Sequence, residues 1–344
     1  MPSNTTAFPP MPVVVMLIGI QAPVVTLLTF GVEAWWVDAF AHFIPWLTLG
    51  LLIQAAVFRN RILRVFSIAA SGALIGLMAT APTAETAASQ PFRCEGPQFR
   101  ISSFNVQYGG HDTVAVAQLF DAQRPDIAFF TEVTPEWDNV LRQVATTRGF
   151  TYYSDPDRGL YGSAVMSRPP LADVTFVPHS RSTPARRLAL DAGDLNARSA
   201  GAPQLRAIVR AGNETFAIGG AHLSFPLMPS THAQALQETD QIAAWARDRM
   251  TDPSLAGVLL VGDFNSTPFS AILRRLHAST GLTTVVPLWP GTWPADLPVG
   301  IAIDHVFASG RLRVESVTVG GDLGSDHRPV SAGIMIEPAR CPGD

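Results

Sequence analysis

Three apolar stretches at the start of the chain constrain its fold more than any other feature. They cover residues 12–32, 40–57 and 62–81, and short polar connections separate them. Each is close to the ~20 apolar residues that a helix needs to cross the hydrocarbon core of a bilayer. We therefore expect residues 1–81 to form a membrane anchor of three transmembrane helices, followed by a polar domain.

Two observations favour membrane helices over a buried helical bundle in a wholly soluble protein. The mean hydropathy of the whole chain is +0.20, which is high for a soluble protein, and the excess comes from the anchor region. Trp35, Trp36 and Trp46 lie near the ends of the stretches, where aromatic residues meet the membrane interface. A lipid bilayer is therefore the first expected partner of this chain.

The charges of the connections predict the orientation of the anchor. Arg59, Arg61 and Arg64 lie between the second and third stretches, whereas Glu33 and Asp38 lie between the first and second. Positively charged loops stay in the cytoplasm. We therefore expect a multi-pass protein of the bacterial inner (cell) membrane, with everything after about residue 82 on the periplasmic, extracytoplasmic side.

A second interpretation of the third stretch leads to the same side of the membrane. Residues 59–81 would then act as an internal signal sequence, with cleavage near the small residues 79–81. In both cases the polar domain lies in a compartment where disulfides form. Cys94 and Cys341 are the only cysteines and bracket this domain. We predict a Cys94–Cys341 disulfide; two unpaired thiols are the alternative.

The charge composition argues against a chain drawn to nucleic acid by its overall field. The formal net charge is -4, and all 24 basic residues are arginine. A strongly basic field, which steers proteins to nucleic acid, is absent at the level of the whole chain. The composition does not exclude a local basic surface, because several arginines lie between residues 181 and 198.

The polar part of the chain alternates between strand and helix patterns, which predicts an α/β fold. Residues 82–97 are rich in Ala, Pro, Thr and Ser and are expected to form a linker, and residues 169–203 show the least regular pattern. Period-two patterns predict strands and amphipathic patterns predict helices. The expected strands are 98–105, 126–132, 162–167, 205–210, 215–221, 258–261, 301–308, 314–319 and 330–336, and the expected helices are 113–123, 134–148, 231–249 and 270–279.

Polar side chains recur where the expected strands end. The stretch VLLVGDFNSTP at residues 258–268 shows this most clearly, since an apolar run leads directly into Asp263 and Asn265. Residues two apart in an extended segment point to the same side, so these two side chains can face one site. In α/β folds the loops after the strands converge on ligands at one sheet edge. The other strand-end residues are Asn105, Glu132, His222, Asp326 and His327.

The motifs at these strand ends resemble those of the endonuclease/exonuclease/phosphatase superfamily, which includes deoxyribonucleases, inositol polyphosphate 5-phosphatases and neutral sphingomyelinases. The resemblance covers residues 98–338 and implies a four-layer α/β/β/α sandwich of two mixed sheets. GDFN and SDHRPV are its most specific motifs. In chain order the motifs are FNV, TEV, AHL, GDFN, IDHVF and SDHRPV.

The resemblance implies a divalent cation at the site. Glu132 matches the principal metal carboxylate of the family, Asn105 the amide beside it, and Asp326 a further position near the metal. An oxygen-rich donor set without cysteine favours Mg²⁺ or Mn²⁺ over zinc. Gln107 follows FNV where the family often has a charged residue, so a second metal ligand in that loop is not expected.

The resemblance also implies the catalytic residues. His327 matches the catalytic histidine and Asp304 the carboxylate that orients it. Asp263 matches the aspartate that positions or activates the attacking water, with Asn265 on the phosphate. His222 matches a position that steadies the phosphate. A histidine paired with a carboxylate exchanges protons near neutral pH.

These residues predict a membrane-anchored, Mg²⁺-dependent phosphoesterase, with a nuclease favoured among the substrates. The alternatives are a phospholipid or sphingomyelin phosphodiesterase, and a non-catalytic module that binds a phosphate ligand. A transport role for the helices is disfavoured, because the stretches lack charged residues that would mark a pathway. No protein partner is predicted.

Several aromatic residues and histidines are left without a catalytic role. Trp289 and Trp293 lie in a Trp/Pro/Gly loop and form either a substrate wall or ordinary loop packing. His305 is expected to be structural. Surface or packing positions are expected for His42, His111, His179, His232 and His277.

Overall fold

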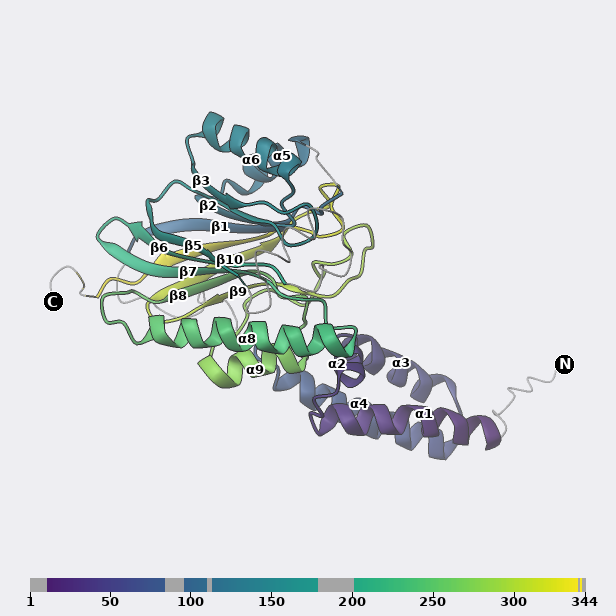
Figure 1. Ribbon diagram of the computed structural model, residues 1–344. Helices are drawn as coiled ribbons and strands as arrows, with labels where there is room; N and C mark the ends of the chain where they lie inside the picture. The colour runs from purple at the N-terminus through teal and green to yellow at the C-terminus, as the bar shows by residue number, and fades with distance from the viewer. Residues whose placement is uncertain (1–10, 84–95, 110–112, 179–200, 340, 342–344) are drawn as a thin grey trace.

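Two β-sheets pack face to face and form the centre of the polar domain (Figure 1). The computed structural model describes residues 11–83, 96–109, 113–178, 201–339 and 341. The first sheet has the strand order β10-β11-β1-β2-β4-β3 and the second β5-β6-β7-β8-β9. The first consists of β1 (Gln98–Asn105), β2 (Ile127–Thr131), β3 (Thr151–Asp155), β4 (Ser163–Ser167), β10 (Leu312–Val319) and β11 (Val330–Ile336). The second consists of β5 (Leu171–Val177), β6 (Gln204–Ala211), β7 (Glu214–His222), β8 (Val258–Asp263) and β9 (Asp304–Ala308).

Both sheets are mixed, and each contains one parallel pair that matters for function. β1 and β2 are parallel in the first sheet, and β7 and β8 are parallel in the second. The carboxyl ends of two parallel neighbours lie at the same sheet edge. Each sheet therefore brings two strand ends, with their following residues, to one edge.

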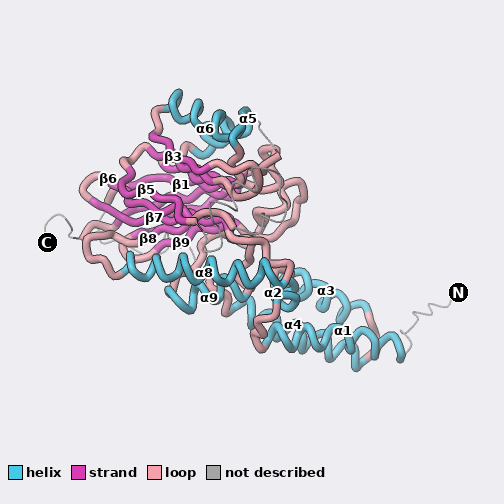
Figure 2. Tube along the Cα trace, viewed as in Figure 1, coloured by secondary structure: helices cyan, strands magenta, loops and turns pink. Residues whose placement is uncertain are grey.

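A helical layer covers the outer face of each sheet (Figure 2). Helices α5 (Thr113–Gln123) and α6 (Pro135–Arg148) cover the first sheet, and α8 (Pro229–Met250) and α9 (Ala271–Thr280) cover the second. The residues of β2 are all apolar or small because both faces of this strand are covered. Phe129 faces the core between the sheets, and Phe130 faces α5 and α6. A strand covered on both faces loses the alternation of a half-exposed strand. The predicted four-layer α/β/β/α sandwich is confirmed.

The described part of the anchor region, residues 11–81, contains four helices, whereas three membrane-spanning helices are predicted. They are α1 (Met11–Thr29), α2 (Trp35–Ala41), α3 (Ile44–Val57) and α4 (Arg61–Ala79). Among the described residues, α1 and α4 are long and apolar enough to cross a membrane, and α2 with α3 adds a third only if this pair counts as one span.

The predicted second span, residues 40–57, is therefore not one straight helix. It begins in the last turn of α2 and continues in α3, and these two helices are bent by 69° relative to each other. α3 contains Pro45 in its first turn, where proline is tolerated, whereas a helix interior excludes it. With 14 residues, α3 is about 21 Å long at 1.5 Å per residue, shorter than the ~30 Å hydrocarbon core.

Two strands were not expected from the sequence. β3 and β5 are both edge strands of their sheets. β5 lies within the region predicted to be least regular, and its pairing with β6 is interrupted by a bulge between Ala172 and Thr175. An edge strand pairs with a neighbouring strand on one side only. The side chains of β3 and β5 are mostly half-buried or exposed, so their sequences lack a clear apolar pattern. The strand expected over residues 301–308 begins only at Asp304, because Ile301 instead pairs with Trp293 in an isolated bridge.

Two sequence-based expectations fall largely outside the described residues. Most of the predicted linker, residues 82–97, is one of them, and the predicted Cys94–Cys341 disulfide is the other because of Cys94. Both stay predictions.

Gly220 of β7 allows the close approach of the two sheets beside the site. A Cβ atom built there would lie 2.5 Å from the Phe129 ring, well inside the ~3.5–4.0 Å contact distance of carbon atoms. We expect Gly220→Ala to lower the free energy of unfolding by about 1–3 kcal/mol, the usual cost of overpacking a core. Urea unfolding of the full chain measures this. Gly321→Ala is the control, because no atom of the described residues lies within 4 Å of a Cβ built at Gly321. Equal stability of the two variants would contradict the close packing of Gly220 against Phe129.

Candidate active site

The strand ends predicted to carry the site come together between the two sheets. In the second sheet, Asp263 at the end of β8 is paired in register with His222 on one side and Asp304 on the other. In the first sheet, Asn105 ends β1 in register with Thr131, the residue before Glu132. Asn105, Glu132, His222 and Asp263 thus converge because the parallel pairs of the two sheets end at the same edge. Asp304 joins them as the first residue of β9, which runs antiparallel to β8.

The buried amide of Asn105 connects the two sheets at this edge. Its Nδ2 donates to Oε1 of Glu132 at 3.0 Å and to Oδ2 of Asp263 at 3.1 Å. Its Oδ1 accepts from the backbone N–H of Gln107 at 3.0 Å. The second oxygen of Glu132 accepts from the backbone N–H of Tyr108 at 3.0 Å. Two carboxylates from different sheets are thus held beside one amide.

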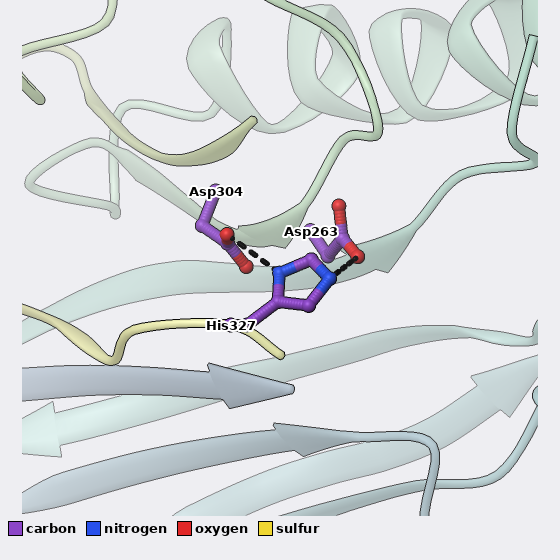
Figure 3. Close-up of side chains that lie close together, drawn as sticks. All are labelled: Asp263, Asp304 and His327. Atoms are coloured by element: carbon purple, nitrogen blue, oxygen red, sulfur yellow. Dashed lines mark hydrogen bonds and ion pairs between the residues drawn. The ribbon is translucent and has the colours of Figure 1, made fainter. Parts of the chain in front are cut away.

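His327 lies between two aspartates, as Figure 3 shows. Its Nδ1 is 2.9 Å from Oδ2 of Asp304, and its Nε2 is 3.7 Å from Oδ2 of Asp263. All three side chains are almost fully buried. Asp304 therefore fixes the ring orientation and leaves Nε2 directed toward Asp263.

The neighbouring charges shift the pKa values of this group strongly. Burial alone would lower the pKa of His327, but the charges of Asp304 and Asp263 outweigh it and raise the pKa to about 10. Burial raises the pKa of Asp263 to about 6, against the opposing positive charge of His327. At neutral pH the imidazole is consequently protonated, and Asp263 titrates close to neutrality.

His222 and Asn265 complete the rim of the site. His222 Nε2 is 3.7 Å from Oδ2 of Asp263 and 4.0 Å from Oε1 of Glu132. The backbone N–H of Asn265 donates to Oδ1 of Asp263 at 2.8 Å, and its side-chain amide donates to the carbonyl of Leu223 at 2.8 Å. The Asn265 side chain is thus held in a fixed direction next to Asp263.

Asp326 is placed differently from the other predicted metal ligands. It is half-buried, and its Oδ2 accepts from the indole N–H of Trp293 at 3.2 Å. It neighbours His327 in the chain and contributes negative charge to it. Among the predicted site residues it is the one whose carboxylate is held mainly by an aromatic loop residue.

Backbone strain gathers at the site. Of the non-glycine residues with positive φ in the described chain, Gln107, Glu132 and Asn265 lie here, with φ of 58°, 61° and 49°. Such conformations are unfavourable for residues with a Cβ and persist only where their surroundings enforce them. The hydrogen bonds of Asn105, Tyr108 and Asp263 supply that enforcement.

The donor groups fit a divalent cation. Glu132 and Asp263 present carboxylates beside the same amide, and the negative charges on neighbouring oxygens favour a cation. Asp263, Asp304 and His327 also place one ligand atom each within 4.8 Å of one another, but His327 is protonated at neutral pH and paired with Asp304, so Glu132 and Asp263 are the better candidate ligands. Within the described chain, the buried Oδ1 of Asp304 and Nδ1 of His222 have no hydrogen-bond partner. Carboxylate-rich donors of this kind suit Mg²⁺ or Mn²⁺.

Two supporting residues were missed by sequence reasoning. Ser325 Oγ donates to the carbonyl of Asn105 at 2.7 Å and accepts from the backbone N–H of His327 at 3.1 Å. Thr292 Oγ1 accepts from the backbone N–H of Asp304 at 3.1 Å. Ser325 opens the SDHRPV motif and could have been singled out there, but no sequence signal marks Thr292.

The remaining histidines and tryptophans also have defined places. His305 is buried with Nδ1 2.9 Å from Thr284 Oγ1 and Nε2 2.8 Å from the carbonyl of Ser266, as a structural residue would be. Trp293 binds Asp326, whereas Trp289 is exposed. His42 and His232 are buried between the anchor and the sandwich, and His111 and His179 lie outside the described residues.

Solved structures with the same architecture come from bacteria and animals. An endonuclease/exonuclease/phosphatase family protein from Bacteroides thetaiotaomicron aligns with a TM-score of 0.54 at 15% identity, covering 70% of this chain and 99% of its own. Zebrafish (D. rerio) TDP2, complexed with a single-stranded DNA product, gives 0.52 at 16% identity, with 69% and 98% covered. The mannosyl-6-phosphatase Bt3783 of Bacteroides thetaiotaomicron gives 0.51 at 15% identity, with 69% and 99% covered. At these identities the likeness establishes the fold.

The fold and the acid–histidine site together define a class of α/β/β/α sandwich hydrolases. The sequence model of the endonuclease/exonuclease/phosphatase family matches residues 102–327. The chain belongs to this family, whose members are phosphoesterases. A comparison of the sequence with curated proteins gave no match.

The raised pKa of Asp263 predicts how the stability of the protein changes with pH, which can be measured without an activity assay. Its carboxyl binds a proton more tightly in the folded state than in the unfolded state. This proton binding therefore stabilises the fold at low pH, and the stabilisation is lost as pH rises from about 4 to about 6. We expect Asp263→Asn to gain about 1.4 kcal/mol of stability relative to wild type between pH 5 and pH 7.5, because about one pKa unit of the shift acts in this range and one unit corresponds to about 1.4 kcal/mol. Thermal unfolding in EDTA measures this.

The control for this prediction is Asp248→Asn, an exposed position on α8 away from the site. Its stability relative to wild type is expected to change little over the same pH range. A constant difference for Asp263→Asn at both pH values would contradict the electrostatic picture of the site.

Proposed function

We propose that this chain hydrolyses a phosphoester with the help of a divalent cation, Mg²⁺ or Mn²⁺. The observation that carries the proposal is the Asn105 amide, which holds the carboxylates of Glu132 and Asp263 together beside the His327–Asp304 pair. Glu132 and Asn105 are the proposed metal-holding residues, with Asp326 near them. When bound, the cation supplies positive charge that offsets the charge of the phosphate.

The proposed roles of the protein side chains follow from their protonation. Asp263, with a pKa near 6, is a carboxylate at neutral pH and a suitable acceptor for a proton of the attacking water. His327 carries a proton on Nε2 at the same pH and can donate it to a phosphate oxygen. Asp304 holds the ring through Nδ1, and His222 and Asn265 are the proposed contacts to the phosphate.

Two classes of phosphoester are candidate substrates. A nucleic acid is supported by the likeness to TDP2 with bound single-stranded DNA. A membrane phospholipid is supported by the contacts of the anchor helices with loops of the site, such as that of His42 with Thr267. A non-catalytic phosphate-binding module is disfavoured, because the proposed acid, base and metal positions are all filled by reactive side chains.

Loss of one side chain should separate catalysis from metal binding. We expect His327→Ala to lower kcat by about 10²–10⁴-fold, the usual share of a general acid or base, with the Mn²⁺ affinity close to wild type. Glu132→Gln should raise the half-saturating Mn²⁺ concentration by at least about tenfold, since even outer-shell changes cost about 10–100-fold in metal affinity.

The measurements are hydrolysis of bis(p-nitrophenyl) phosphate and calorimetric titration with Mn²⁺, using the full chain in detergent. Asp248→Asn, exposed on α8, serves as the control. Near-wild-type turnover by His327→Ala would contradict the assigned role. Wild-type protein that binds Mn²⁺ but hydrolyses none of a panel of nucleic acid and lipid phosphoesters would favour the binding module.

We further propose that the polar domain lies on the extracytoplasmic side of a bacterial inner membrane. The support is the distribution of charge, with Arg59, Arg61 and Arg64 at one end of the anchor helices and Asp38 at the end that contacts the sandwich. Proteinase K added to intact spheroplasts of a bacterium producing the chain should digest the domain while a cytoplasmic marker stays intact. Protection of the domain until lysis would reverse the orientation.

A further inference from the structure

The anchor is bonded to the sandwich through buried polar contacts. Asp38 of α2 accepts from the backbone N–H of Ala271, the first residue of α9, at 2.5 Å through Oδ1. Its Oδ2 is 3.3 Å from Nε2 of His232 in α8. Nδ1 of His42 accepts from the backbone N–H of Thr267 at 3.2 Å. Buried polar contacts of this kind require one defined geometry. The anchor therefore fixes the position of the sandwich beside the membrane.

These contacts fall on segments that carry the candidate active site. Thr267 follows Asn265 by two residues, in the loop after β8. The N-terminal part of α8, which contains His232, follows the loop that begins directly after His222. Figure 1 places α2 next to the start of α8. The site therefore lies at the end of the sandwich to which the anchor is attached.

The loops on both sides of β8 expose apolar side chains at that end. The loop after β7 exposes one set and the long loop before β9 the other. Exposed apolar side chains gathered at one place mark contacts with proteins, ligands or membranes. The exposed residues are Phe225, Leu227 and Met228 after β7, and Trp289, Leu297 and Val299 before β9.

An apolar cavity of about 210 Å³ lies where the anchor meets the loop before β9. Trp46 and Leu49 of α3 and Met78 of α4 line it on the anchor side. Ile301 and Ala302, just before Asp304 in the chain, line it on the other. The cavity thus joins membrane helices to the strand that carries a catalytic carboxylate.

The aromatic residues Trp46 and Trp289 border the cavity, with ring centroids 5.9 Å apart. Tryptophan is enriched at the interface of membrane and water. Leu49 and Leu52 are exposed on α3, a helix whose apolar surface continues toward the expected bilayer. Because Leu49 also lines the cavity, the exposed apolar surface of α3 leads directly to it.

We propose that the substrate is a phospholipid, with its phosphoester at the site of Asp263 and His327 and one hydrocarbon chain in the cavity between α3, α4 and the loop before β9. This inference rests on the proposed phosphoester hydrolysis and names its substrate class. The hydrocarbon chain stays in an apolar environment while the headgroup rises to the site. A soluble phosphoester lacks that contribution and binds through its phosphate alone.

The test compares matched pairs of substrates that share one phosphoester, with and without hydrocarbon chains. The pairs are dioleoyl phosphatidic acid against glycerol 3-phosphate, and dioleoyl phosphatidylcholine against glycerophosphocholine, with single-stranded DNA as a further substrate. The full chain is assayed with Mn²⁺ in dodecyl maltoside micelles. We expect the dioleoyl member of at least one pair to have a kcat/KM at least about tenfold higher than its soluble partner, about 1.4 kcal/mol.

Leu49→Trp fills the cavity and should remove most of this preference while leaving the hydrolysis of soluble phosphoesters unchanged. Leu52→Trp is the matched control, because Leu52 is similarly exposed on the same helix but does not line the cavity. Met78→Trp fills the cavity from α4 and keeps the test decisive if Leu49→Trp fails to fold.

The outcomes separate this inference from the proposed function. Equal kcat/KM for both members of each pair, or a preference for DNA, would overturn the phospholipid inference and leave phosphoester hydrolysis standing. Equal effects of Leu49→Trp and Leu52→Trp would overturn the role of the cavity. Hydrolysis of no substrate in the panel would overturn the proposed function, and the inference with it.

Discussion

The hydrogen bonds of one buried amide hold this site together. Asn105 ends a strand of the first sheet and binds Glu132 from the neighbouring strand and Asp263 from the other sheet. A buried carboxylate is costly unless hydrogen bonds or charges satisfy it, so the amide makes the meeting of two acids feasible. His327 then adds a positive charge beside Asp263, and Asp304 keeps it in place. The two-sheet sandwich is the frame that brings these side chains to one edge.

The N-terminal helices are held against this frame by specific polar contacts. Asp38 accepts a hydrogen bond at the start of α9, and His42 binds the loop that follows Asp263 and Asn265. A freely tethered domain would need no buried polar contacts with its anchor. The fixed geometry instead gives the site a constant distance and orientation relative to the apolar helices α1 and α4, which supports the proposal that the substrate is a membrane phospholipid.

The sequence predicted the parts of the structure in which local pattern and final environment agree. β1, α5 and β11 have the bounds expected, because their apolar residues face cores on one or both sides. β3 and β5 escaped prediction as edge strands with weak patterns. The resemblance to a family suggested the site residues, and the strand order then brought Asn105, Asp263 and Asp304 together across long chain separations. The bend between α2 and α3 and the partners of Asp38 and His42 depend on tertiary contacts that no local pattern records.

We propose above all that a divalent cation binds beside Glu132 and Asn105, within reach of Asp263. Anomalous diffraction from crystals of the full chain grown with Mn²⁺ tests it most directly. We expect an anomalous peak with a Glu132 oxygen at a metal-ligand distance of about 2–2.3 Å, typical of hard cations with oxygen ligands. A Mn²⁺ peak elsewhere in the molecule, with no peak next to Glu132, would contradict the account.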